Sequence, residues 1–387
     1  MLAYKSQTLD NLHIQEEAAK ALRKDCIDAP TYKAIEAAHP VNFYTPNPVI
    51  KIGLFILTLV TVSFSLGLLA LMTLDLQHIE KAIRALCIFV GLGCYAVLEL
   101  FIASKKIFRA GLDDGLLWCA TGLLISSLTI SDDPDGITLC GVTLIVTLLA
   151  TLRFADMVMA GIAFLAFLGL AFSLLIKMGP TAKTVVPFVI MALSLVIYFI
   201  VRRGMRQQLL RHYNRCLTVV AVLALLTFYL AGNYFVVREV SNTMFDLQLK
   251  EGQSIPGAAF FWICTIIIPI VYGYLGIRKK DAILLRTGLV LLAAIVFTVR
   301  YYHHVMPLEA AMVAGGLILT VGAWALIRYL QIPRYGFTYV EADEPSLADK
   351  LKLESLIIAQ TYVPGAPKPD MDFGGGSGGG GGASGDY

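Results

Sequence analysis

Residues Ile52–Met72 read IGLFILTLVTVSFSLGLLALM, a stretch without a charged side chain or a proline. As an α-helix, its 21 residues would be about 31 Å long, which matches the roughly 30 Å hydrocarbon core of a bilayer. Nine further apolar runs follow it along the chain. The sequence therefore predicts an all-α fold, a polytopic transmembrane helix bundle of about ten spans.

The composition also indicates a protein whose outer surface faces lipid. Of the 387 residues, 15% are charged and 57% are hydrophobic, whereas soluble domains carry about 25% charged residues. The third and fourth apolar runs are short and are joined by a turn sequence, which predicts a tight hairpin. If one of them is re-entrant, the count falls to nine or eight. The predicted spans are 52–72, 85–103, 113–130, 137–153, 156–176, 184–201, 216–237, 257–277, 282–300 and 307–328.

The basic residues are distributed unevenly among the connections between spans. With ten spans, both termini lie on one side of the membrane, and that side holds 24 of the 31 Lys and Arg residues. Cytoplasmic loops carry an excess of Lys and Arg. We therefore expect both termini in the cytoplasm. The clusters 105–109, 202–206 and 278–280 are interpreted as topology signals that can also touch anionic headgroups.

Three segments outside the spans have compositions of their own. Residues 1–49 combine a helical pattern with Pro-containing turns, and they predict a small cytosolic helical hairpin that leads into the first span. Residues 331–372 form a cytosolic segment with a predicted amphipathic helix at 346–360. Residues 373–387 are mostly glycine and cannot pack a core, so we expect a disordered tail, either native or a linker added for expression.

Short motifs carry two resemblances to known proteins. The ending Phe373–Tyr387 is similar to the Gly-rich tails of bacterial membrane-anchored proteins of the TPM-domain type. The motifs within the chain are Tyr44-Thr-Pro-Asn-Pro, Ile52-Gly-Leu-Phe, Arg109-Ala-Gly-Leu-Asp-Asp-Gly-Leu-Leu and Arg300-Tyr-Tyr-His-His. With the hairpin and the many spans, they resemble a family of uncharacterised bacterial multi-pass proteins. That resemblance implies a bacterial inner-membrane protein and supplies no catalytic residue.

The cysteines and the common catalytic motifs give no sign of a cofactor or a metal. All seven cysteines except Cys26 lie in or beside apolar runs, where cysteine behaves as a small hydrophobic side chain. The sequence has no CxxC pair, no phosphate-binding glycine loop, and no GxSxG or HExxH motif. We therefore predict no cofactor, no metal site, no nucleic-acid partner and no soluble-type catalysis. The bilayer itself is the expected partner.

Three residues within the spans are candidates for a transport function. Glu99 is the only acid well inside a span, and charged groups there are costly and often functional. It could couple transport to protons, or it could pair with Lys105, with Arg109 or with a neighbouring helix. Asn233 lies near the outer end of the seventh span, and Pro269 predicts a kink in the eighth.

A second polar group lies at the outer lip between the ninth and tenth spans. It consists of Arg300, His303, His304 and Glu309. A cation, two imidazoles and a carboxylate within ten residues could bind an anionic headgroup or perform general acid–base catalysis. The alternative is an interfacial belt, in which Glu309 follows a proline at a helix N-terminus. Adjacent histidines point to different helix faces, so we do not expect them to share a metal.

Two further groups of charges are predicted to be ion pairs that hold cytosolic turns. Asp113 and Asp114 are expected to pair with Arg109 at the mouth of the third span. Arg153 and Asp156, three residues apart, are expected to pair with each other.

The sequence favours a non-enzymatic function, as a permease or as an accessory or scaffold component of an envelope system. Residues 1–49 or the Gly-rich tail would then contact a protein partner. The alternative is an intramembrane enzyme that acts on a lipid-linked substrate at the outer leaflet through the residues of the outer lip. The sequence specifies no substrate, transport direction or oligomeric state.

Overall fold

The computed structural model is helical throughout the residues that it describes. These are residues 2–44, 46–73, 78–130, 134–179, 182–245, 255 and 257–303, with separate positions between 310 and 328. They include no β-strand, and the one isolated bridge among them joins Tyr44 to Ile107. The predicted all-α fold is confirmed.

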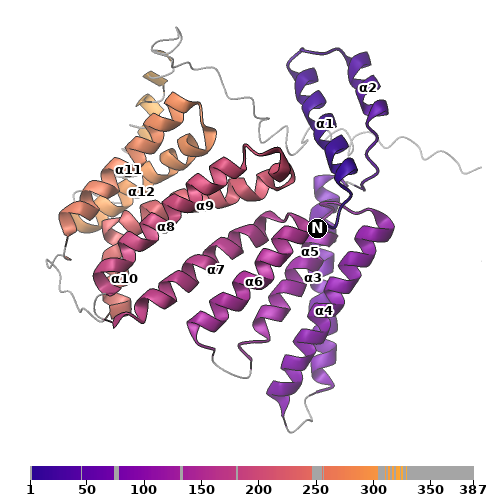
Figure 1. The fold of residues 1–387 in the computed structure, drawn as a ribbon, viewed down its shortest axis with the longest axis horizontal. Coiled ribbons are helices and arrows are strands. Elements are labelled where there is room, and N and C mark those ends of the chain that lie inside the picture. The colour runs from indigo at the N-terminus through magenta and orange to yellow at the C-terminus, as the bar shows by residue number, and fades with distance from the viewer. Residues whose placement is uncertain are drawn as a thin grey trace, which may run out of the picture. The chain divides into compact units, whose positions relative to one another are not determined.

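The helices succeed one another along the chain (Figure 1). Their bounds are α1 (Ser6–Arg23), α2 (Ala29–Ala38), α3 (Pro48–Leu71), α4 (Ile79–Lys105), α5 (Leu112–Ser126), α6 (Gly136–Phe154), α7 (Met157–Ile176), α8 (Ala182–Gly204), the 3-10 helix η2 (Gln208–Tyr213), α9 (Asn214–Gly232), α10 (Tyr234–Phe245), α11 (Ala258–Lys279) and α12 (Ala282–His303).

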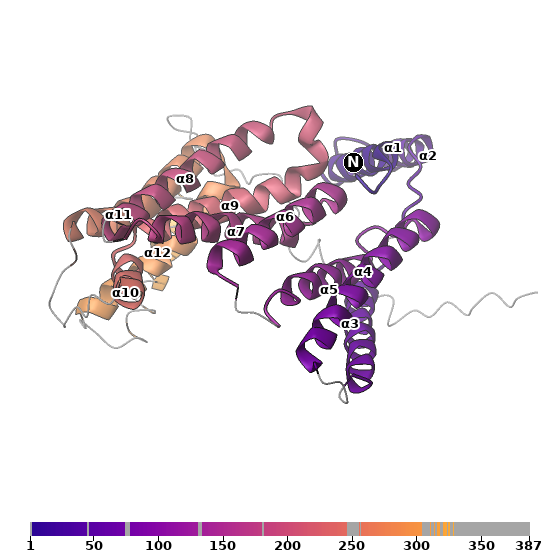
Figure 2. The same cartoon turned by 60° about the horizontal axis from the view of Figure 1, so that its bottom comes forward.

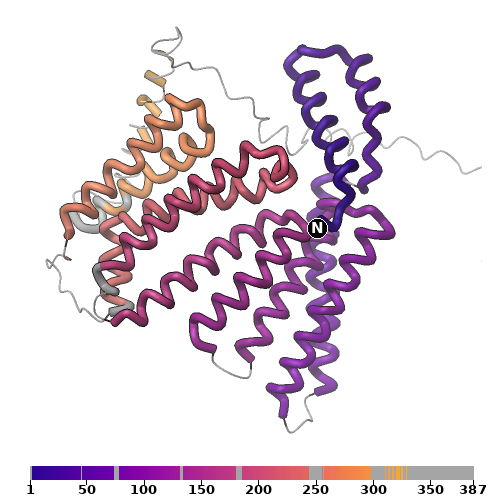
Figure 3. The backbone as a smooth tube through the Cα atoms, viewed as in Figure 1, coloured from indigo at the N-terminus to yellow at the C-terminus, as the bar shows by residue number. Residues whose placement is uncertain are grey.

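Helices that are neighbours in the sequence pack as pairs. The most extensive contacts join α4 to α5, α6 to α7, α8 to α9, and α11 to α12, and the pairs follow one another in the backbone trace (Figure 3). Helix α5 contacts α6, with which the sequence predicts a tight hairpin, but it packs more extensively on α4 and α3, while α6 packs mainly on α7. Helix α9 also contacts α7, α11 and α12, which lie beside it in both cartoon views (Figures 1 and 2).

Seven of the described helical segments are long and apolar enough to cross a membrane. They are α3, α4, α6, α7, α8, α11 and the continuous segment of η2 and α9. Helix α5 has 15 residues, and α12 contributes a shorter apolar stretch, Ala282–Val296. A membrane-embedded helical protein is therefore confirmed, whereas the count of ten spans stays a prediction.

The outer faces of these helices carry large apolar side chains. Phe64 on α3 is 74% exposed, Phe89 on α4 is 72% exposed, and Leu100 on α4 is 67% exposed. In water, each Å² of such surface would cost about 25 cal/mol relative to burial. Lipid removes this cost, so the exposed apolar faces have the character expected of a bilayer-facing surface.

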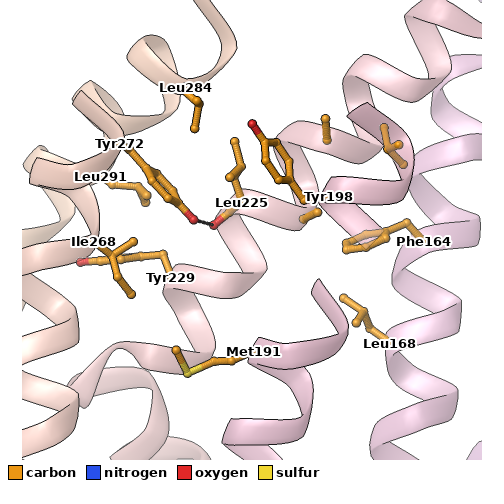
Figure 4. Close-up of a cluster of buried hydrophobic side chains, with 13 residues drawn as sticks. Phe164, Leu168, Met191, Tyr198, Leu225, Tyr229, Ile268, Tyr272, Leu284 and Leu291 are labelled. Carbon is orange, nitrogen blue, oxygen red and sulfur yellow. Dashed lines mark hydrogen bonds between the residues drawn. The ribbon is translucent and has the colours of Figure 1, made fainter. Parts of the chain in front are cut away.

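The largest hydrophobic core lies around α9 (Figure 4). Ala221 and Ala224 on α9 are fully buried, which allows neighbouring helices to approach closely. The Tyr272 hydroxyl, from α11, donates a hydrogen bond of 3.3 Å to the carbonyl oxygen of Leu225 (Figure 4). The polar end of this buried tyrosine is thus satisfied by a helix backbone.

The pair α11 and α12 is packed backbone to backbone at Gly276. A Cβ atom placed on Gly276 would lie 2.6 Å from the backbone nitrogen of Leu285 in α12. No other residue type fits at that distance without a shift of one helix. Close approach through small residues is a common way for membrane helices to associate.

The predicted seventh span, 216–237, is not one continuous helix. Helix α9 ends at Gly232, and α10 begins at Tyr234. Between them, Asn233 is extended, with φ of −81° and ψ of 127°.

Several predicted segments lie outside the described residues. These are the amphipathic helix 346–360, the rest of the segment 331–372, and the tail 373–387. The span 307–328 is described only at separate helical positions.

Candidate functional site

The connection between α4 and α5 is a tight loop with three left-handed backbone positions. Lys106 and Arg109 each have φ of 51°, and Gly111 has φ of 91°. A Cβ on Gly111 would lie 2.1 Å from the carbonyl oxygen of Lys51, so only glycine fits against the start of α3. Non-glycine residues rarely adopt positive φ, which typically costs about 1–3 kcal/mol per position.

Two aspartates at the start of α5 hold this loop. The Asp113 carboxylate, which is buried, accepts hydrogen bonds from the backbone N–H groups of Arg109, at 2.6 Å, and Ala110, at 2.9 Å. Asp114 forms an ion pair of 3.1 Å with Lys51. The predicted pairing of both acids with the Arg109 side chain is wrong, because backbone donors occupy Asp113 and Lys51 occupies Asp114.

The Arg109 side chain is half-buried, and no described carboxylate forms an ion pair with it. Its guanidinium carbon lies 4.9 Å from the centre of the Phe108 ring, which is a cation–π contact. Burial lowers the pKa of Arg109, and the charge of Arg215 lowers it further. Arginine nevertheless stays protonated in proteins, so this is a positive charge without an ion pair to a described carboxylate, and the charges of Glu16 and Asp114 act on it only from beyond ion-pair distance.

Two cavities meet at Arg109. The acidic cavity has a volume of 270 Å³, and its charged lining residues are Lys51, Arg109, Asp113, Asp114 and Asp156. The basic cavity has a volume of 220 Å³, and its charged lining residues are Glu16, Glu17, Lys20, Arg109, Arg211 and Arg215. Tyr4 and Phe108 line both cavities and pack edge to face at 4.9 Å.

Asp156 lines the acidic cavity from the turn between α6 and α7. One of its carboxylate oxygens accepts a hydrogen bond of 2.8 Å from the N–H group of Met159, so Asp156 caps the N-terminus of α7. Burial raises the pKa of Asp156 and also that of Tyr4. The Tyr4 hydroxyl is therefore protonated at neutral pH and can donate a hydrogen bond.

The N-terminal hairpin of α1 and α2 closes the basic cavity. The backbone N–H group of Ala3 donates to the carbonyl oxygen of Arg153, at 2.9 Å, where α6 ends. Asp10 and Glu16 on α1 form ion pairs with Arg211 in η2, at 2.7 Å, and with Arg215 in α9, at 3.2 Å. These contacts fix α1 to the bundle end formed by loop 106–111, the turn at 155–156 and η2, which we call the docking end.

The transport candidate Glu99 is engaged by a neighbouring helix. Its carboxylate receives hydrogen bonds from Arg153 Nε, at 2.9 Å, and from an Arg153 terminal nitrogen, at 3.0 Å. The Tyr95 hydroxyl donates a third, at 2.9 Å. The expected pair of Arg153 with Asp156 is replaced by this bidentate pair with Glu99, because Asp156 turns to cap α7.

Asn233 satisfies the backbone at the break between α9 and α10. Its side-chain NH₂ group donates to the Tyr229 hydroxyl, at 2.9 Å, and to the Thr298 hydroxyl, at 3.2 Å. Its carbonyl oxygen accepts from the N–H group of Val236 at 3.3 Å, and the Thr265 hydroxyl accepts from the N–H group of Tyr234 at 3.0 Å. The break is thus hydrogen-bonded within the protein, as a membrane environment requires.

The three transport candidates do not share a described cavity. Pro269 is fully buried within α11. A third, apolar cavity of 180 Å³ lies between α7, α8, α9 and α10 and is lined by Val186, Leu230 and Val237 among others. Neither this cavity nor the acidic and basic cavities include Glu99, Asn233 or Pro269 in their linings.

The group at the outer lip falls mostly outside the described residues. The backbones of Arg300 and His303 belong to the last turn of α12, whereas His304 and Glu309 lie outside the described part of the chain. Within the described residues, no cluster of three or more His, Cys, Asp or Glu side chains could hold a metal ion.

Sequence reasoning missed most of the residues around Arg109. Tyr4, Lys51, Arg211 and Arg215 reach it from distant parts of the chain. The charges on α1 are complementary to those on η2 and α9. However, Asp10 and Arg211 are 201 positions apart in the sequence, and Glu16 and Arg215 are 199 positions apart. No local pattern joins residues at that separation, so only the fold reveals the site.

The comparisons with known proteins give no functional assignment, so the function must be inferred from the chemistry of the site. Neither a protein-family model, nor a curated protein, nor a solved structure matches this chain.

Proposed function

We propose that this chain is a non-enzymatic scaffold or accessory protein of a bacterial cytoplasmic membrane. Both termini face the cytoplasm, and the hairpin of α1 and α2 is held there to bind a protein partner. The bundle of about ten spans serves as the anchor and as the platform for the hairpin.

One observation carries this proposal: the two helices of the hairpin make different contacts with the rest of the protein. Helix α1 buries Leu9 and Ala18 and uses its acids to bind η2 and α9. Helix α2 has no buried residue, and α1 is its main contact among the described helices. Helix α2 is thus fixed in position through α1 while its surface is free to bind a partner.

The distribution of charge supports a cytoplasmic position for the docking end. Lys105 at the end of α4 lies there with the loop that contains Lys106 and Arg109, as do η2 with Arg211 and the beginning of α9 with Arg215. The N-terminal segment contacts the same end through Ala3 and α1. Excess Lys and Arg on one side is typical of the cytoplasmic face.

The polar groups inside the bundle favour a scaffold over a permease. Glu99 is paired with Arg153, and Asn233 is hydrogen-bonded to Tyr229 and Thr298. Groups committed to internal contacts hold helices together and are not free to bind a translocated solute. The rival enzyme hypothesis rests on the outer-lip side chains, which lie outside the described residues.

Site-specific photocrosslinking in bacterial membranes tests the partner proposal. We would place benzoyl-phenylalanine at Lys33 or Ala37, which are exposed on α2. Both positions should give the same protein adduct. The matched control is Phe64, exposed on α3, which should crosslink to lipid. If the α2 positions give no protein adduct while all three variants insert equally, the scaffold proposal is wrong.

A further inference from the structure

We propose that the basic cavity is a binding site for a phosphate-bearing anion, held by the Arg109 guanidinium between α1 and the start of α9. This site goes beyond the scaffold function, because it assigns a ligand to the junction between hairpin and bundle.

One cation that lines the basic cavity has no ion pair with a described carboxylate. Lys20 is paired with Glu17 at 2.5 Å, Arg215 with Glu16 at 3.2 Å, and Arg211 with Asp10 at 2.7 Å. These three pairs account for every acid of the cavity lining and for all its cations except Arg109. An anion that enters the cavity therefore meets a free guanidinium.

The loop that carries Arg109 is built at a cost in backbone strain. The backbone of Arg109 has a left-handed conformation. The N–H groups of Arg109 and Ala110 donate hydrogen bonds to the Asp113 carboxylate, and these bonds hold that conformation. Gly111 locks the loop against Lys51. Strained residues that the surroundings hold in place are typical of functional sites. Arg109, one of the two non-glycine residues with positive φ in this loop, is also the lining cation without an ion pair.

The cavity has the donors and the room that a phosphate needs. A guanidinium presents planar pairs of N–H groups that match phosphate oxygens. Arg215 supplies a second cation, because its pair with Glu16 is about half exposed, at 49% and 45%, and such surface pairs are worth at most about 1 kcal/mol. The volume of 220 Å³ is many times the roughly 10–15 Å³ that a single water molecule needs, so a phosphate group has room.

A phosphate group fits this cavity better than a single carboxylate does, because it offers more oxygens to the two arginines, Arg109 and Arg215, that line the cavity. The phosphate could belong to a soluble ion or solute, or to the headgroup of an anionic phospholipid at the membrane surface. In either case it would contact both the loop at 106–111 and the start of α9, and α1 would cover it.

Calorimetric titration of the full-length protein in detergent micelles with inorganic phosphate tests the soluble source. Arg109→Gln should weaken phosphate binding at least tenfold. Lys105→Gln removes the same charge from an exposed position at the end of α4 and should change the affinity less than twofold. Glu16→Gln frees Arg215 and should tighten binding, whereas Glu36→Gln, exposed on α2, should leave it unchanged.

Native mass spectrometry tests the lipid source. Protein extracted from phosphatidylglycerol vesicles should retain a lipid adduct that Arg109→Gln loses and Lys105→Gln keeps. Protein from phosphatidylcholine vesicles serves as the zwitterionic control. Phosphate binding without the adduct identifies a soluble ligand, and the adduct without phosphate binding identifies the headgroup.

Hydrogen exchange keeps the proposal testable if Arg109→Gln does not fold. Phosphate or phosphatidylglycerol should slow amide exchange in α1 of the wild-type protein, because the ligand lies beneath it. Glu16→Gln should then reach the same protection at lower phosphate concentration. The proposal is overturned if the wild-type protein shows neither phosphate binding nor a phosphatidylglycerol adduct, or if Arg109→Gln folds and binds both as the wild-type protein does.

Discussion

Glu99 illustrates how a single charge is accommodated within a helix of this bundle. It is half-buried, and both of its oxygens contact Arg153 on the adjacent helix. Tyr95, one turn before it on α4, adds a further donor. Charge-assisted bidentate pairs of this kind are among the stronger hydrogen-bonded contacts in proteins.

Removal of one partner from this pair should be worse than removal of both. We expect Arg153→Gln to destabilise the protein by about 1–3 kcal/mol, because it leaves the Glu99 carboxylate without its cation. The double variant Glu99→Gln/Arg153→Gln should regain part of that loss. Thermal unfolding in detergent measures both. A double variant that is less stable than Arg153→Gln alone would contradict the assigned pair.

Asp156 should make the stability depend on pH. Burial raises the pKa of Asp156 in the folded protein, so the folded state binds this proton more tightly than the unfolded state does. Stability should therefore fall as the pH rises from below the unfolded pKa, about 3.9, through the raised folded value. Asp156→Asn retains a capping side chain and removes the charge.

The measurement for Asp156 is the melting temperature at two pH values. At pH 7, Asp156→Asn should melt at a higher temperature than the wild-type protein, and the difference should shrink towards pH 4. Glu36→Gln, at an exposed position on α2, is the control for loss of a negative charge. An Asp156→Asn variant that is less stable than wild type at pH 7 would show that the carboxylate is needed in its charged form.

At the scale of single residues, the sequence identified charged side chains of interest but not the groups with which they pair. The sequence drew attention to Glu99, Arg109, Asp113 and Arg153. It placed Arg109 with the two acids of α5 and Arg153 with Asp156. Backbone donors and helices distant in sequence compete for the same charges, and this competition is settled only by the packed fold.

At the scale of helices, glycine decides how closely α11 and α12 pack. The Cβ position of Gly276 overlaps the backbone of α12, whereas that of Gly273, one turn earlier, has no atom of the described residues within 4 Å. The two glycines share one helix but meet different surroundings.

This difference gives a matched pair of substitutions. Gly276→Ala should destabilise the protein by about 1–3 kcal/mol, because the two helices must separate. Gly273→Ala should be neutral or slightly stabilising, because alanine favours a helix over glycine by about 1 kcal/mol. Thermal unfolding of both variants in one detergent checks this. Equal losses in the two variants would show that helix propensity, and not the close approach, governs the pair.

The bounds of most helices follow closely from the sequence, whereas the break at Asn233 does not. A long apolar run predicts a helix, because in a membrane a helix satisfies its backbone N–H and C=O groups within the run itself. The run 216–237 continues across Asn233, and nothing in it excludes a straight helix. The bonds from Asn233 to Thr298 and from Tyr234 to Thr265 reach other helices, so only the packed bundle shows what satisfies the break.

At the scale of the whole molecule, one native cysteine reports on orientation. Cys26 is exposed in the connection between α1 and α2, whereas the other six cysteines are buried or half-buried in helices. A membrane-impermeant maleimide should therefore react selectively at Cys26.

With the N-terminal hairpin in the cytoplasm, Cys26 should be labelled in inside-out membrane vesicles and protected in intact spheroplasts. Cys26→Ser is the control and should abolish the labelling. Labelling in intact spheroplasts would reverse the proposed orientation. It would also place the docking end, with the basic cavity, on the outer face of the membrane.

The sequence by itself determined that this chain is a helical membrane protein, because long apolar runs cannot be hydrated and can satisfy their backbones only as helices. It also located nearly every described helix. The tertiary structure alone decided which charges meet, such as Glu99 with Arg153, and that Arg109 has no ion pair with a described carboxylate. Those outcomes depend on contacts between segments up to 201 positions apart, and such contacts leave no periodic signal in the chain.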